Sequence, residues 1–138
     1  MLPRNYRFRA LNGCGQTIVQ NAITVKCRRW RFAADGAVVW ESSESTVYIM
    51  DEGAGLATAG NDAGTAVDNS TDLWIGGDFE FEVTTPASAA GDVSVYLERS
   101  SDAGSSFDTL DGNSAIISRL CAVITCGAST TYRKTFSL

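Results

Sequence analysis

Histidine is absent from this sequence, and the sites that depend on it are absent with it. Without an imidazole, the Ser-His-Asp and Cys-His catalytic sets, histidine proton shuttles and histidine-containing metal sites are excluded. Long apolar runs are also missing: the longest span four or five residues, whereas a membrane-spanning helix needs roughly 20. The first residues lack the apolar region of a secretory signal, so we expect no signal and no membrane contact.

Cysteine is scarce, and its spacing fits no metal site. The four cysteines are Cys14, Cys27, Cys121 and Cys126, with no CxxC pair among them. Zinc knuckles and ribbons require such pairs, so we expect no metal ion and no cofactor. In a reducing cytoplasm these side chains would serve as small buried apolar groups. A disulfide between Cys121 and Cys126 stays open as an alternative, if the two flank a bend.

Length and composition favour one folded domain. The 138 residues are 44% hydrophobic and 20% charged, as in ordinary soluble proteins. A chain of this length buries about two-thirds of the surface that it exposes when unfolded, which is enough for one core. We therefore expect a single domain over residues 1–138.

Charge is unevenly distributed along the chain. The first 34 residues hold seven of the 11 Lys and Arg residues and no acidic residue, and all 16 Asp and Glu residues follow. The net charge of −5 is unfavourable for DNA binding, which depends on neutralising phosphates, so no specific nucleic-acid partner is expected. The asymmetry can serve ion pairs within one fold or complementary surfaces on neighbouring subunits.

Apolar residues recur with the two-residue period of β-strands. No stretch longer than ten residues has helical spacing, so we predict an all-β fold: a single antiparallel β-sandwich, jelly-roll or immunoglobulin-like, with about eight strands. The predicted strands cover residues 6–10, 23–32, 38–41, 46–50, 73–84, 92–99, 115–125 and 131–138.

The second of these strands changes its buried face. Ile23, Val25 and Cys27 share one parity, whereas Trp30 and Phe32 share the other. A strand changes face only by inserting a residue, so a β-bulge is predicted near residues 28–29. Residues 34–36, Ala-Asp-Gly, then supply a hairpin turn.

Residues 51–72 are rich in glycine and alanine, with only Leu56 and Val67 as larger aliphatic residues. Long loops in compact domains are usually functional or mobile. We therefore predict a long loop or arm here, extending from the sandwich.

A turn motif follows the sixth predicted strand. Its residues Ser100, Asp102, Gly104 and Phe107 resemble the Asp-box, S-x-D-x-G-x-x-(W/F), of sialidase-like propellers. The short carboxylate would accept backbone N–H groups, the glycine would supply a positive φ, and the ring would anchor the loop. One copy does not make a propeller, so the expected role is a structural turn.

Carboxylates are the only abundant catalytic candidates. Glu80 and Glu82 lie two apart on one predicted strand, which places both on one face. A glycosidase instead needs carboxyls on separate elements around a cleft, so these two are expected on a solvated face. The aspartates at 62, 68 and 72, and at 102, 108 and 111, match no calcium loop. The sequence therefore favours a protein that is not an enzyme and has no catalytic residues.

One basic and aromatic cluster could contact a partner. Arg28, Arg29, Trp30 and Arg31 are consecutive, and arginine can stack on tryptophan. The alternative is a buried Trp30 with outward arginines paired to acids such as Glu41. Trp40 and Trp74 end strands beside loops, so together they could also form a carbohydrate platform.

The chain resembles the small all-β virion proteins of tailed bacteriophages. The segments that carry this resemblance cover about half of the chain: residues 6–13, 15–18, 26–32, 35–36 and 95–100, running into Asp102 and Gly104. No functional residue is carried over from that group.

The resemblance implies a non-enzymatic structural protein of the virion, assembled in the host cytoplasm. Its expected partners are other copies of itself or another virion protein such as the major capsid protein. A capsid decoration or cement role fits the short single domain, and a tail or connector subunit is the alternative. A third possibility is a carbohydrate-binding β-sandwich module.

Overall fold

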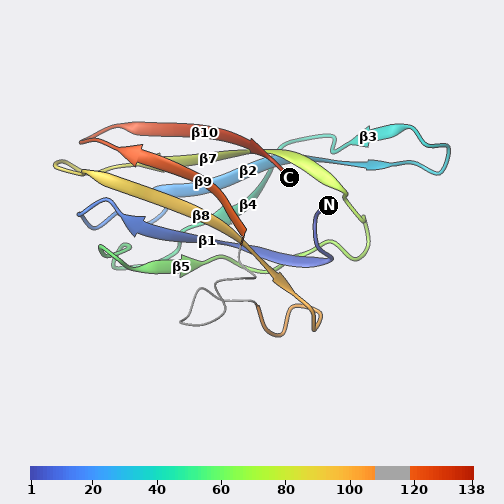
Figure 1. Cartoon of the computed structure of the whole chain (residues 1–138), viewed down its shortest axis with the longest axis horizontal. Helices are drawn as coiled ribbons and strands as arrows, with labels where there is room; N and C mark the ends of the chain where they lie inside the picture. Colours follow the sequence, from blue (N-terminus) through green and yellow to red (C-terminus); the bar gives the residue numbers. More distant parts are fainter. Residues whose placement is uncertain (108–118) are drawn as a thin grey trace.

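The computed structural model of the chain describes residues 1–107 and 119–138. Over these residues the fold is all-β, and two antiparallel sheets pack against each other as a sandwich (Figure 1). No helix in this part of the chain is long and apolar enough to span a membrane. The strands are β1 (Asn5–Gly13), β2 (Ile23–Phe32), β3 (Val38–Trp40), β4 (Ser45–Ile49), β5 (Asn61–Ala63), β6 (Val67–Asp68), β7 (Gly76–Thr84), β8 (Gly91–Ser100), β9 (Arg119–Cys126) and β10 (Thr131–Ser137).

Each sheet has two long central strands and shorter strands at one edge. In the first sheet β1 and β8 are central, β9 forms one edge, and β5 and β6 follow one another along the free side of β1. In the second sheet β7 and β2 are central, β10 forms one edge, and β3 and β4 share the free side of β2. The β9–β10 turn carries the chain from the first sheet to the second.

The core lies between the sheets and follows the predicted alternation. Every second side chain of β1 is buried from Tyr6 onward, and the same holds in β7 for Phe79, Phe81 and Val83. The rings of Phe8 in the first sheet and Phe79 in the second have centroids 5.6 Å apart. Burial of these apolar faces supplies the main driving force for joining the two sheets.

The predicted β-sandwich is confirmed, and all eight predicted strands have counterparts. The seventh is described from Arg119 onward, and residues 115–118 lie outside the described part. The bulge predicted near Arg28 is wrong: β2 pairs with β7 in continuous register from Ile23 to Trp30, and its one irregularity lies between Val25 and Lys26 against β4. No change of face is needed, because Trp30 lies on the outer face of the sheet.

The loop or arm predicted for residues 51–72 is part of the sandwich. It contains β5 and β6, which both pair with β1, and Leu56 forms a bridge with Ile18. The backbone can pair although the segment has few large aliphatic residues, because polar side chains hold it. The buried amide of Asn12 donates to the Gln16 and Leu56 carbonyls, and the Tyr48 hydroxyl donates to Asp62 at 2.8 Å.

Candidate interaction surface

A two-stranded hairpin extends beyond the sandwich at one end. It consists of the second half of β2, the turn at residues 33–37, and β3 (Figure 1). The turn forms as predicted: Gly36 has a φ of +85°, and the Asp35 carboxylate accepts the Ala37 N–H at 3.0 Å. A second bond joins the Ala33 N–H to the Ala37 carbonyl at 2.8 Å. These contacts fix the tip without the help of the sandwich.

The hairpin exposes large apolar side chains. Phe32 is 54% exposed, Val38 53%, Trp40 43% and Val39 38%. Because Trp30 pairs with Trp40 and Phe32 with Val38 across the two strands, these four side chains share one face. The rings of Trp30 and Phe32 meet edge to face with centroids 5.6 Å apart. We call this set, Trp30, Phe32, Val38 and Trp40, the hairpin face.

The predicted patch at residues 28–31 is divided between two faces. Arg28 and Trp30 lie on the outer side of β2, whereas Arg29 and Arg31 lie on the opposite side, where their guanidinium carbons are 5.7 and 5.4 Å from the ring centroid of Trp74. The four residues therefore do not form one contact surface. Trp30 is half-buried. It therefore belongs neither to a patch formed by all four residues nor to the core, which were the two alternatives.

Arg29 is held firmly at the base of the hairpin. Its Nε donates to Glu41 at 3.0 Å, its backbone N–H donates to the same carboxylate, and its Nη1 donates to the Tyr6 hydroxyl at 3.4 Å. Burial acts to raise the pKa of Glu41, but the bonds from Arg29 outweigh it and hold that pKa below its usual value. Burial also raises the pKa of Tyr6 to about 12. This cluster joins the hairpin to β1.

The expected carbohydrate platform of Trp40 and Trp74 is not formed. Trp74 is only 9% exposed and lies beneath two arginines, whereas Trp40 is exposed on β3. Trp74 instead lines a recess of about 410 Å³ together with Leu2, Phe32 and Leu73. Its indole N–H is buried without a hydrogen-bond partner in the described part of the chain.

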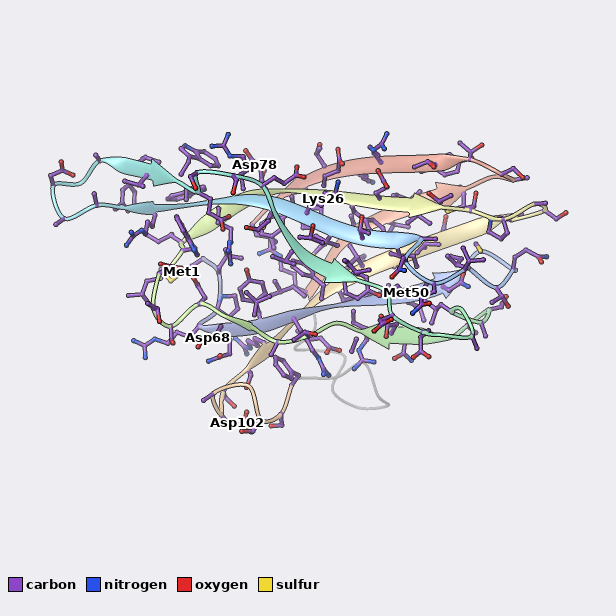
Figure 2. All side chains as sticks on the ribbon, turned by 180° about the vertical axis from the view of Figure 1, so that it is seen from behind. Met1, Lys26, Met50, Asp68, Asp78 and Asp102 are labelled. Atoms are coloured by element: carbon purple, nitrogen blue, oxygen red, sulfur yellow. The ribbon has the colours of Figure 1, made fainter. Side chains whose placement is uncertain are left out.

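Trp40 borders a groove on the outer face of the second sheet. The groove measures about 470 Å³ and lies over the neighbouring pairs Lys26 with Glu80 and Arg28 with Asp78. Figure 2 shows Asp78 close to the start of the hairpin and Lys26 nearer the middle of the sheet. An aromatic wall beside charged groups of both signs can bind polar ligands.

The Asp-box-like turn has the expected hydrogen bonds. The Asp102 carboxylate accepts the Ser106 N–H at 2.8 Å, and the Ser100 hydroxyl accepts the Gly104 N–H at 2.8 Å. The Ser100 and Ser106 hydroxyls also donate to Asp102 and hold its pKa well below the usual value. Gly104 has a φ of +91°. Figure 2 places Asp102 in a loop that extends from the end of β8.

The ring of this motif contacts an arginine. Phe107 was expected to anchor the loop to the core, but it is half-buried with the Arg7 guanidinium 4.3 Å from its centroid. The turn is therefore connected to the outer face of β1.

Glu98 on β8 was missed by the sequence analysis. Its side chain is fully buried, accepts from Arg7 Nε at 2.7 Å and contacts Arg9 Nε at 2.5 Å. Glu98 shares its parity with Ser94 and Tyr96, on the outward side of β8. The two arginines, on the neighbouring strand, cover it there. The signal available in the sequence was the pair of arginines two apart on a strand, with no acid near them in the chain.

The remaining candidates from the sequence are the carboxylates and the four cysteines. Glu80 and Glu82 share one face of β7, as predicted, where Arg133 is 3.7 and 2.5 Å from them. No group of three or more possible metal ligands occurs among residues 1–107 and 119–138, and Asp108 and Asp111 lie outside that part. All four cysteines are free. Cys121 and Cys126 belong to one extended strand, about 16 Å apart along it, which rules out the disulfide alternative.

No family model, curated protein or solved structure matches the chain.

Proposed function

We propose that this chain is a non-enzymatic structural subunit that acts by packing against neighbouring protein subunits. The observation that carries the proposal is the gathering of exposed apolar side chains at one end. Nine large apolar side chains are exposed in the described part of the chain, and six of them belong to the hairpin or to the adjacent recess. The six are Met1, Phe32, Val38, Val39, Trp40 and Leu73.

A gathering of this kind marks an interaction site in soluble proteins. The hairpin face contributes little to the core, because its side chains point away from the space between the sheets. Its tip is closed by its own turn, and its base is fixed by Arg29 and Glu41. A rigid apolar projection loses little conformational freedom on binding, which favours a permanent contact with another subunit.

The setting that we propose is a bacteriophage virion, with a capsid decoration or cement role. The support is the resemblance of the sequence to small all-β virion proteins, together with the compact sandwich and its projecting hairpin. The partner would be another copy of the chain or another virion protein such as the major capsid protein. A tail or connector subunit is the alternative within the same class, and it would use the same surface.

Imaging the purified source particle tests this proposal directly. We expect density for the sandwich on the particle, with the hairpin against a neighbouring subunit. Density on the shell would support the decoration role, and density on the tail would support the connector role. A particle without the protein would contradict both.

A matched pair of variants tests the surface. Phe32→Ser and Val19→Ser each remove an exposed apolar side chain, of 54% and 63% exposure. Only the first lies on the hairpin face, so only Phe32→Ser is expected to prevent incorporation into the particle. Equal incorporation of the two variants would contradict the proposed surface.

A carbohydrate-binding module is the second candidate, and the groove beside Trp40 favours it. A sugar ring could stack on Trp40 while the charged groups of Lys26 and Asp78 bind its hydroxyls. Titration with a panel of glycans should then change tryptophan fluorescence in the wild type and leave Trp40→Ala unchanged. Wild-type fluorescence that stays constant across the panel would exclude this candidate.

A further inference from the structure

The β3 strand leaves one edge of its backbone unpaired within the described part of the chain. It pairs with β2 on one side only, and Figure 1 shows it at the margin of the projecting hairpin. Exposed edges are normally protected by charged residues, prolines or bulges. The sequence of β3 is Val-Val-Trp and has none of these. By contrast, β10 carries Arg133 and Lys134, and Lys134 Nζ donates to the Val123 carbonyl on β9 at 3.1 Å.

The hydrogen bonds of the hairpin show which backbone groups of β3 are open. The Ala33 N–H bonds the Ala37 carbonyl, and the Glu41 N–H bonds the Arg29 carbonyl. Bonded pairs alternate along an antiparallel ladder, so Val39 forms the bonded pair with Arg31 between them. The N–H and C=O groups of Val38 and Trp40 therefore point away from β2, toward the free edge.

We propose that a second copy of this chain pairs with that edge, β3 against β3, in antiparallel orientation about a two-fold axis at Val39. This inference rests on the proposed function and names its partner. Val38 of one copy would face Trp40 of the other, and the two would exchange both backbone hydrogen bonds. The symmetry repeats this exchange on the other side of the axis. The two Val39 residues would form the close pair at the centre, with Cα atoms about 4.5 Å apart.

The side chains favour this register. Val38 and Trp40 lie on the same face, so each copy places a smaller side chain opposite a large ring. Their 53% and 43% exposed surfaces would cover one another. The hairpin faces of the two copies would then form one continuous apolar surface, four strands wide.

Charge does not oppose the pairing. The cations of the hairpin, Arg28, Arg29 and Arg31, lie on β2, one strand away from the shared edge, and Arg29 is paired with Glu41. In the paired form the two β2 strands would be three strand spacings apart, about 14 Å. That separation exceeds the Debye length of about 8 Å at physiological ionic strength, so repulsion between them is screened. A short strand pair buries little area, so we expect association that depends on concentration.

Cross-linking through a central cysteine tests the register. Val39→Cys, in a Cys121→Ser background, would place two thiols within disulfide distance across the axis. Val19→Cys in the same background is the control, because Val19 is 63% exposed and lies outside the hairpin. Under mild oxidation we expect Val39→Cys to form a covalent dimer at least about tenfold faster than the control. Equal rates would overturn the proposal.

A proline substitution tests the backbone bonds separately. The Val38 N–H points to the free edge, so Val38→Pro removes an intermolecular donor and leaves the β2–β3 ladder unchanged. Val38→Ile is the matched control. In sedimentation velocity we expect wild type and Val38→Ile to dimerise with rising concentration, and Val38→Pro to stay monomeric. Continued protection of the Glu41 amide from hydrogen exchange shows that the hairpin is intact.

The outcomes separate this inference from the proposed function. A protein that stays monomeric, with Val39→Cys no more reactive than the control, overturns the β3–β3 pairing. If Phe32→Ser still blocks incorporation into the particle in that case, the hairpin binds a different protein and the structural role stands. If Phe32→Ser is incorporated normally as well, both fail.

Discussion

The two halves of β2 differ in what they contribute to the molecule. From Ile23 to Cys27 the strand pairs with β7 on one side and β4 on the other, and every second side chain is buried. From Arg28 to Phe32 the strand passes into the hairpin, where none of its residues is fully buried. One continuous strand thus serves stability in its first half and, in the function that we propose, recognition in its second. Substitutions in the two halves should therefore have different consequences.

The largest loss of stability is expected in the body of the sandwich. Phe81 on β7 is fully buried and lies opposite Val25 in the first half of β2. Phe81→Ala should lower the free energy of unfolding by about 3–5 kcal/mol, because it removes apolar contacts and leaves a cavity. Urea denaturation measures this change. A loss below about 1 kcal/mol would mean that the core is not packed between the sheets as described.

The buried ion cluster should show the next largest effect. Glu98→Gln leaves Arg7 and Arg9 without their shared counter-charge, in a site where the Glu98 side chain is fully buried. We expect a loss of about 3 kcal/mol in urea denaturation. The control is Glu80→Gln, since Glu80 is more exposed and lies 3.7 Å from Arg133, so its loss should be small. Equal losses of unfolding free energy in the two variants would show that the burial of Glu98 does not strengthen its ion pairs.

Glu98 also shows why part of the fold was predictable and part was not. Alternation identifies the strands because a half-buried strand repeats every two residues, and β2 was placed with its observed bounds. The same reasoning assigns outward residues to solvent, which is wrong for Glu98. Its burial depends on side chains of the neighbouring strand, and strand order cannot be read from local periodicity.

The prediction of a loop or arm at residues 51–72 missed the pairing of β5 and β6 for a related reason. Their pairing with β1 depends on single polar contacts, such as those of Asn12 and Tyr48, rather than on an apolar pattern. Within the candidate surface, the sequence indicated the turn at Asp35 and the aromatic residues near it. It did not indicate that Arg29 and Arg31 lie over Trp74, because that contact joins segments distant in the chain. The exposed edge of β3 likewise could not be predicted, because it follows from the order of the strands in the sheet.

The junction between the two halves should respond to pH. The pKa of Glu41 is lowered in the folded protein, so the folded state holds its charge where the unfolded chain binds a proton. This stabilisation is present above the ordinary Glu pKa of about 4.3 and is lost as pH falls through the folded value. Glu41→Gln should cost about 1–2 kcal/mol at pH 7, because it weakens charged hydrogen bonds to Arg29.

The difference between wild type and Glu41→Gln should shrink as the pH is lowered from 7 to 3. Urea denaturation at several pH values measures it. Glu44→Gln is the control, since Glu44 is more exposed and lies 3.7 Å from Lys26. A difference that stays constant over this range would show that the charge of Glu41 does not stabilise the junction.

The smallest effect on stability is expected at the hairpin face. Phe32 is 54% exposed and lies outside the core, so Phe32→Ser should change the free energy of unfolding by less than about 0.5 kcal/mol. This holds at protein concentrations where the chain is monomeric, because dimerisation would add stability through mass action. At higher concentration the wild type should gain stability that Val38→Pro, which lacks the intermolecular donor, does not gain. Thermal unfolding at a low and a high protein concentration measures the stability of the monomer and the stability gained on dimerisation. If Phe32→Ser destabilised the monomer as much as Phe81→Ala, the hairpin would belong to the folding core, and the contrast between the two halves of β2 would be lost.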